Sequence, residues 1–310
     1  MTRFNFVAEL DLFGRPLLRK NSALEATHSG GRGEPMHDWF PYLEGFSSAF
    51  VTNLFDEYFE KPFSVLEPFS GVGTTPVTLS QLGIECGYSE INPVLRELTA
   101  LKAFALSLPS EKRKVLTQKL YYLGGAFESG ASDLVPCVDL TGAFEASFGN
   151  VKYFPPDHFD LVCRLKTYER TIDDKTLRAF FRIAVATSLL KGSLLLRAGD
   201  VRYKTKRELA EGIPSLSLLI EDKLKLMASD IQSINDAGAF GKLRLVNENA
   251  KDLGSYDGQK FDGVITSPPY LNGTNYIRNT KLELWYLEYL KTKQDMRFYR
   301  SAVVTSAIND

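Results

Sequence analysis

The segment from Ile265 to Tyr270 combines a hydroxyl group, two consecutive prolines and an aromatic ring. It follows the apolar run 261–264, which is typical of a buried strand, and two prolines cannot donate hydrogen bonds to a sheet. The chain must therefore turn out of the strand, which leaves the carbonyl groups of Ser267 and Pro268 without ladder partners. A hydroxyl, free carbonyls and an aromatic face suit a planar ring with an exocyclic amine. The candidate catalytic residues are Ser267, Pro268, Pro269 and Tyr270.

A second candidate site lies in the glycine turn of the segment 67–74, Glu-Pro-Phe-Ser-Gly-Val-Gly-Thr. The turn joins a predicted strand to a predicted helix, and a glycine-rich backbone at a helix N-terminus admits a ligand closely. Glu90 ends the next predicted strand, from which a carboxylate can reach ribose hydroxyls. These features fit NAD as well as S-adenosylmethionine. Against NAD, Thr75 and Pro76 stand where the dinucleotide fingerprint has its third glycine, and no lysine marks a phosphate-binding loop.

Both segments resemble motifs of the amino-methyltransferases of DNA. The family's catalytic motif is (Ser/Asp/Asn)-Pro-Pro-(Tyr/Phe), with serine most often in the cytosine-N4 branch, and its cofactor motif is Asp-Pro-Phe-x-Gly-x-Gly-Thr. Glu67 stands where the cofactor motif usually has Asp, and its side chain is one methylene longer. The resemblance implies that S-adenosyl-L-methionine is the cofactor, with Glu90 as its ribose ligand. The residues expected to cradle its methionine part are Glu67, Pro68, Phe69, Gly71, Gly73 and Thr74.

The resemblance also implies weaker assignments around the cofactor. Asn249 lies where the family commonly has an Asp that binds the adenine amine, and Asp252 competes for this role. Phe40 and Tyr42 belong to a segment that resembles the one closing over the cofactor, although an aromatic core cluster explains these residues almost as well.

The chemistry implied is direct methyl transfer to a flipped-out base in double-stranded DNA. Ser267 and the carbonyl of Pro268 would accept the amine protons, so that the nitrogen lone pair can attack, while Tyr270 stacks on the base. No histidine follows Ser267, which disfavours an acyl-transfer serine. We expect cytosine N4 as the target, in a restriction-modification or defence context. Adenine N6 methylation and a catalytically silent, cofactor-binding subunit remain open alternatives.

Composition places the 310 residues among ordinary globular proteins, with 44% hydrophobic and 24% charged residues. No apolar run approaches the roughly 18 residues of a membrane span, so we expect a cytoplasmic protein without a membrane segment. The three cysteines and three histidines are widely spaced, which predicts neither disulfides nor a metal site.

The net charge of −1 conceals a strongly basic stretch, because residues 161–207 hold twelve basic and four acidic side chains. Such an asymmetry indicates a surface that faces phosphate groups, although a solvated basic helix face would look the same. The candidate nucleic-acid contacts are Arg202, Lys204, Lys206 and Arg207, together with Asn275 and Arg278 beyond the catalytic motif.

The elements that must position these residues form an α/β fold. A strand, a helix and a second strand between residues 63 and 90 predict a parallel, Rossmann-like methyltransferase sheet, which strands at 243–246 and 261–267 extend. Helices are expected at 39–59, 95–108, 112–123, 174–190, 218–234 and 280–292. We divide the chain into an N-terminal arm (1–35), a catalytic core (36–100 and 240–310) and a helical insert (101–239).

The sheet is expected to be incomplete on its C-terminal side, because four strands are predicted where such methyltransferases have seven. An open sheet edge is adhesive. A second subunit, a second copy of the chain in a homodimer, or the N-terminal arm is expected to complete it.

Overall fold

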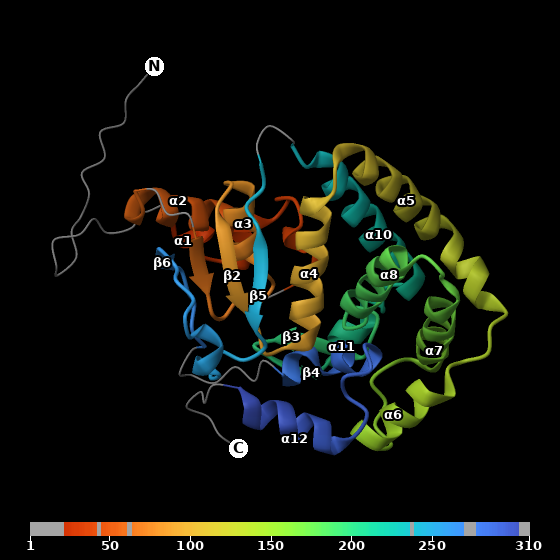
Figure 1. Cartoon of the computed structure of the whole chain (residues 1–310). Coiled ribbons are helices and arrows are strands. Elements are labelled where there is room, and N and C mark those ends of the chain that lie inside the picture. The colour runs from red at the N-terminus through yellow and green to blue at the C-terminus, as the bar shows by residue number, and fades with distance from the viewer. Residues whose placement is uncertain (1–21, 42–44, 61–63, 236–238, 270–276, 304–310) are drawn as a thin grey trace.

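A computed structural model describes residues 22–41, 45–60, 64–235, 239–269 and 277–303 of the protein (Figure 1). Within these residues a parallel sheet occupies one side of the molecule and a group of helices the other. No helix among the described residues has the length and hydrophobicity that a membrane span requires.

The sheet has the strand order β5-β2-β1-β6, and each of its pairs is parallel. Its strands are β1 (Ser64–Glu67), β2 (Glu85–Ser89), β5 (Leu243–Asn247) and β6 (Gly263–Val264). This confirms the predicted parallel sheet and the positions of its strands. The last strand is shorter than the predicted 261–267, although Asp262 and Ile265 still donate backbone hydrogen bonds to β1, at 2.9 and 3.1 Å.

The helices next to the sheet follow from the sequence around β1. α3 (Thr74–Gln81) is buried along most of its length and returns the chain from β1 to β2. α2 (Ser48–Tyr58) packs beside α3, and its first turn is capped by the Ser47 side chain, which accepts from Phe50 N at 3.0 Å. A small apolar core of Val51, Val65, Leu79, Cys86 and Ile265 joins these helices to the sheet.

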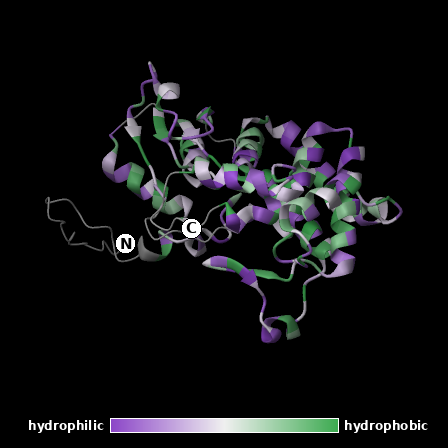
Figure 2. Cartoon of the chain, turned by 90° about the horizontal axis from the view of Figure 1, so that it is seen from below, coloured by the Kyte–Doolittle hydropathy of each residue, from purple (hydrophilic) through white to green (hydrophobic). Residues whose placement is uncertain are grey.

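The helical side of the molecule encloses a larger core, which includes the fully buried Phe127, Phe180, Phe181 and Trp285. Figure 2 shows hydrophilic and hydrophobic residues alternating along its helices, as expected for helices with one packed and one solvated face. Its helices are α4 (Pro93–Ser107), α5 (Ser110–Ser132), α6 (Val138–Phe148), α7 (Pro156–Thr171), α8 (Lys175–Ser188) and α10 (Leu216–Ser233). The predictions for α4, α8 and α10 are confirmed. α5 continues past the predicted end at residue 123, through Gly124 and Gly125, to Ser132, and α6 and α7 were not predicted.

Two other predicted helices were also wrong in extent. Residues 37–39 form a short 3-10 turn, and the following helix begins only at Ser48. The helix expected at 280–292 is α11 (Lys281–Tyr286), which ends before Glu288 takes a left-handed conformation, with φ of 65°. A new helix, α12 (Lys293–Ala302), starts with a capping box between Thr292 and Asp295.

Several short elements complete the described chain. A hairpin that the sequence did not predict consists of β3 (Leu195–Ala198) and β4 (Asp200–Tyr203), with Gly199 at its tip. The other short helices and 3-10 turns are α1 (Ser22–Glu25), η1 (His28–Gly31), η2 (His37–Trp39), α9 (Lys206–Ala210), η3 (Leu253–Tyr256) and η4 (Arg278–Thr280).

Candidate functional site

The predicted cofactor and catalytic motifs lie at the same edge of the sheet. β1 ends at Glu67, β2 is followed by Glu90, and β6 leads into Ser267. Parallel strands place their carboxyl ends together, and in open α/β sheets this edge is where ligands bind. The hairpin β3–β4 lies at the same end of the molecule in Figure 1.

The glycine turn after β1 has the geometry of an anion-binding loop. Gly71 and Gly73 have left-handed φ values of 52° and 83°, and a Cβ atom at Gly73 would lie 2.6 Å from Thr99 Oγ1. The turn is held by Ser70 N donating to Ser89 O at 3.0 Å and by Gly73 N donating to Ser70 O at 2.8 Å. The first N–H groups of α3 have no acceptor within the helix, so this end of α3 favours a negatively charged ligand.

Glu90 ties the glycine turn to the end of β2. Its carboxylate accepts from Gly71 N at 2.7 Å and from Asn92 N at 2.8 Å. Burial raises the pKa of Glu90 to about 7, although these backbone donors and Arg96 oppose the shift. Each carboxylate oxygen retains a second lone pair, so the side chain can still accept from the hydroxyl groups of a ligand.

Glu67 connects the cofactor motif with the catalytic motif. Its side chain is almost fully buried, accepts from Phe69 N at 3.0 Å, and lies beside the side chains of Thr75 and Thr266, the latter one residue before Ser267. Burial raises the pKa of Glu67 to about 7, and the nearby Glu90 contributes to this rise. The carboxylate thus braces the ends of β1 and β6 against each other.

Lys102 is a residue of this site that the sequence analysis missed. Its Nζ donates to the carbonyl of Val72, inside the glycine turn, at 2.8 Å, and the side chain is only 2% exposed. Burial lowers the pKa of Lys102 to about 7, with Asp230 and Asp38 opposing and Lys223 reinforcing the shift. A lysine on the packed face of α4, one turn after Thr99, was the available signal.

The Ser267-Pro268-Pro269 segment has left the sheet. Among the described residues, the last hydrogen bond from this strand to β1 is donated by Ile265 N to Leu66 O, at 3.1 Å. Ser267 and Pro268 are exposed at the sheet edge. This agrees with the turn that the double proline predicted. Tyr270, Asn275 and Tyr42 lie outside the described residues.

The weaker cofactor assignments find other partners. Asn249 donates to Ala302 O at 3.1 Å and accepts from Lys251 N at 3.0 Å, so its side chain fixes the end of α12 to the loop after β5. Asp252 is exposed and accepts from the Ser255 hydroxyl. Phe40 is fully buried, with the Arg197 guanidinium 5.4 Å from its ring centre, which matches the aromatic core alternative.

The candidate nucleic-acid residues divide into two groups. Arg202 makes two hydrogen bonds to Glu208, at 2.8 and 2.9 Å, and Lys204 donates to the carbonyls of Lys191 and Ser193, at 3.2 and 2.7 Å. Both therefore hold the hairpin to its surroundings. The other described candidates are exposed: Lys206 and Arg207 on α9, and Arg278, which pairs with Asp200 at 3.0 Å.

Two of the three histidines are close in space, contrary to their spacing in the sequence. His28 and His37 stack with ring centres 4.2 Å apart. A ring nitrogen of each and a carboxylate oxygen of Asp38 lie within 4.8 Å of one another. His37 Nε2 is already hydrogen-bonded to His28 O, at 2.7 Å. The lone pairs of stacked imidazoles lie in nearly parallel planes and do not converge on one ion, so we assign no metal to this group.

Comparison with known proteins found no matching family model and no matching solved structure. The chain is similar to the Type II methyltransferase M.BsoBI of Geobacillus stearothermophilus, with 25% identity over 303 residues. It is also similar to the Type II methyltransferases M.AvaI of Nostoc sp. and Anabaena variabilis, with 24% identity over 336 residues. These alignments cover 91% and 94% of this chain but only 57% and 65% of the relatives. The chain thus spans less than two thirds of the length of the Type II methyltransferases to which it is similar.

Proposed function

We propose that this chain carries the catalytic site of an S-adenosylmethionine-dependent DNA methyltransferase that modifies cytosine N4 in a restriction-modification context. The observation that carries the proposal is the Glu67 brace, because its contacts with Phe69 and Thr266 join the two motifs at one edge of the sheet. The Type II methyltransferases found as relatives support the same class of enzyme.

The residues at the glycine turn fit S-adenosylmethionine. Ser70 Oγ, in the glycine turn, is a buried polar atom without a hydrogen-bond partner among the described residues. The start of α3 would hold the methionine carboxylate, and Glu90 would accept from ribose hydroxyls. When bound, the cofactor supplies an activated sulfonium methyl group.

The chain's own contribution is to position the base amine. The Ser267 hydroxyl and the Pro268 carbonyl accept hydrogen bonds from its two N–H groups, which favours a pyramidal nitrogen with an available lone pair. After methylation the nitrogen releases one proton to solvent. Because the methyl group is already activated, positioning contributes more than covalent catalysis. Tyr270 is proposed to stack on the flipped-out base, as its place in the motif predicts.

The decisive experiment measures transfer of a tritiated methyl group to double-stranded DNA by the wild-type protein and by Ser267→Ala. Digestion of the product to nucleosides identifies the modified base. We expect N4-methylcytosine, and a loss of at least 100-fold in rate on removing Ser267. N6-methyladenine would assign the chain to the adenine branch. Cofactor binding without methyl transfer, unchanged by the substitution, would identify a catalytically silent subunit.

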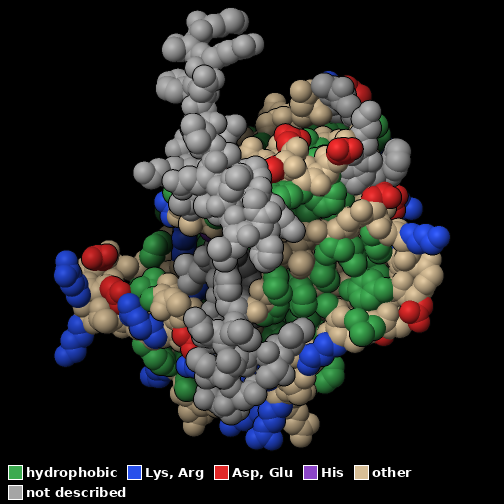
Figure 3. Space-filling model, turned by 90° about the vertical axis from the view of Figure 1, so that its left-hand side faces the viewer, with side chains coloured by type: hydrophobic (Ala, Val, Ile, Leu, Met, Phe, Trp, Pro, Cys, Tyr) green, Lys and Arg blue, Asp and Glu red, His purple; other side chains and the backbone are tan. Residues whose placement is uncertain are grey.

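We also propose that another strand completes a Rossmann-like sheet beyond β6. Among the described residues β6 pairs only with β1, and Val264 is 54% exposed. The face of the molecule on this side carries gathered hydrophobic side chains (Figure 3). A second subunit, a second copy of the chain or the part of the N-terminal arm before α1 would supply the strand. Light scattering of the purified protein distinguishes a strand supplied by another chain from one supplied by the same chain. A monomeric mass would leave only the strand from the same chain.

A further inference from the structure

The hairpin β3–β4 is fastened to the turn that follows the catalytic motif. The side chain of Asn279 in η4 accepts from Val201 N and donates to Gly199 O, both at 3.1 Å. Its amide thus bonds to the backbone on either side of the hairpin tip. Asn279 is 8% exposed, so these hydrogen bonds are shielded from water. Arg278 pairs with Asp200 in the same tip, at 3.0 Å.

Arg197, from the first strand of the hairpin, joins three further segments. Its guanidinium donates to the carbonyl of Pro41 and, at 2.7 Å, to the carbonyl of Asn279. It also lies 3.5 Å from the buried carboxylate of Glu283 in α11. A planar guanidinium can serve several fixed acceptors at once, which a lysine ammonium on a flexible stem does less well.

The same turn is linked to the proposed cofactor site. Asn92 Nδ2 donates to Thr280 Oγ1 at 2.8 Å, and Asn92 N donates to Glu90 at 2.8 Å. The consecutive residues Asn279 and Thr280 therefore hold the hairpin and the Glu90 loop in a fixed relation.

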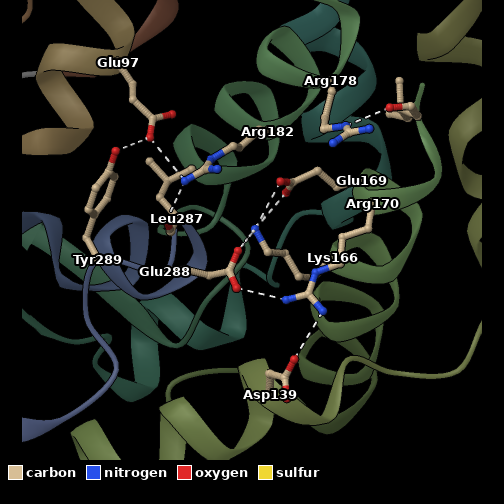
Figure 4. A network of polar contacts seen from close by, with 11 residues as sticks. Glu97, Asp139, Lys166, Glu169, Arg170, Arg178, Arg182, Leu287, Glu288 and Tyr289 are labelled. Carbon is tan, nitrogen blue, oxygen red and sulfur yellow. Dashed lines mark hydrogen bonds and ion pairs between the residues drawn. The ribbon is translucent and has the colours of Figure 1, made fainter. Parts of the chain in front are cut away.

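The far end of α11 is fixed by basic residues of α7 and α8 (Figure 4). Lys166 is fully buried between Glu169 and Glu288, at 3.1 and 2.9 Å, and Arg170 also pairs with Glu288. Arg182 donates to the carbonyl of Leu287. These contacts hold Glu288 in a left-handed conformation, which is strained for a residue other than glycine. Four residues of the basic stretch, Lys166, Arg170, Arg182 and Arg197, therefore contact the chain after the catalytic motif.

We propose that Arg197 and Asn279 are positioning residues for methyl transfer, a role that rests on the proposed function. They hold η4, where the described chain resumes after Ser267-Pro268-Pro269, against the Glu90 loop and the hairpin. In-line transfer between two bound reactants is sensitive to their alignment, and a misplacement of about 1 Å can lower the rate about 100-fold. We call Arg197 and Asn279, with the hydrogen bonds they make to η4 and the hairpin, the clamp. The clamp thus contributes to the rate of the chemical step more than to the affinity for either reactant.

The test compares Asn279→Ala and Arg197→Lys with the control Arg164→Lys. Arg164 also donates to two carbonyls, those of Ser132 and Leu134, and pairs with the carboxylate of Asp160, but it contacts neither η4 nor the hairpin. We expect the single-turnover methylation rate to fall at least 10-fold in both test variants. The cofactor dissociation constant and the KM for DNA should change less than 3-fold, and the control should match wild type. The double variant should lose less than the product of the single losses, because both residues act through one clamp.

Hydrogen exchange keeps the proposal testable even if the wild-type protein methylates no DNA. Exchange of peptides covering residues 265–269 and 277–282 should rise in both test variants and remain unchanged in Arg164→Lys. Unchanged exchange in these peptides overturns the clamp. Test-variant rates within 3-fold of wild type also overturn it, as does a 10-fold loss shared by the control. An inactive wild-type protein with the expected exchange pattern refutes the proposed function instead and leaves the clamp supported as a structural coupling only, which overturns its positioning role.

Discussion

Replacing Lys102 by methionine should stabilise the fold while weakening the proposed cofactor site. The side chain is buried, and its pKa is lowered from 10.5 to about 7. Such a shift corresponds to on the order of 4–5 kcal/mol at neutral pH, because the unfolded chain keeps a charge that the folded chain disfavours. Losing the donor to the Val72 carbonyl costs about 1–3 kcal/mol if the carbonyl stays unpaired. The expected net change is a gain of about 1–4 kcal/mol in unfolding free energy.

The sign of the pH dependence follows from the lowered pKa. Between pH 7 and 10.5 the unfolded chain binds a proton at Lys102 that the folded chain has released, so this residue makes stability rise with pH. Urea unfolding at pH 7 and pH 9 should show the advantage of Lys102→Met shrinking by up to about 2.7 kcal/mol. Subtracting the unfolding free energy of wild type from that of Lys102→Met at each pH removes the contributions of most other titrating groups.

Lys223→Met is the matched control for the effect on the ligand. Lys223 is a partly buried lysine that also donates to a carbonyl, that of Asp38 at 2.6 Å, and burial lowers its pKa to about 8, but no hydrogen bond joins it to the glycine turn among the described residues. Calorimetry should show weaker binding of S-adenosylmethionine in Lys102→Met only. Parallel stability profiles of wild type and Lys102→Met between pH 7 and 9 would refute the reasoning about the buried charge, and equal cofactor affinities would refute the role of the Val72 contact.

Three further predictions test the rest of the site. Neutralising the four basic residues 202, 204, 206 and 207 should lower DNA affinity and flatten its dependence on salt, by a slope of about 0.9 for each lost phosphate contact; an unchanged slope in a filter-binding titration would remove them from the interface. Because burial raises the pKa of Glu90 to about 7, cofactor binding through its ionised form should strengthen as pH rises through 7, and this rise should be absent from calorimetric titrations of Glu90→Gln. Gly73→Ala should destabilise the protein by about 1–2 kcal/mol from backbone strain alone, with a further loss from the contact of the new Cβ atom with Thr99. In thermal melts, the double variant with Thr99→Ala should recover only that further loss. Full recovery of stability would show that the backbone is unstrained.

Local sequence signals were sufficient for the sheet and for the two motifs. Glycine at positions 71 and 73 and proline at 268 and 269 restrict the backbone directly, so the turns they predict follow from the residues themselves. The parallel strands follow for a similar reason, because a short apolar run before a helix has few possible structures other than a buried strand.

The clamp could not be predicted in this way. Arg197 looks like any other member of a basic stretch, and only the tertiary fold shows that Pro41, Asn279 and Glu283 surround it. The charge count predicted a surface, whereas Arg182, Arg197 and Lys166 are engaged within the protein. Sequence composition records how many charges a segment has, but their partners come from distant parts of the chain.

The order of strands in the sheet has a consequence for how the protein folds. β2 pairs with β5, from Cys86 with Leu243 onward, although about 150 residues separate them in the chain, and contacts between such distant segments form slowly. The helices between them close their backbone hydrogen bonds locally, between residues four apart, and can therefore form first. During synthesis β1 and β2 therefore leave the ribosome long before their outer partners β6 and β5, and the unpaired backbone edge of β2 remains open to other chains throughout that interval. We expect refolding yield to depend on protein concentration for this reason, with the helical region acquiring structure before the sheet closes.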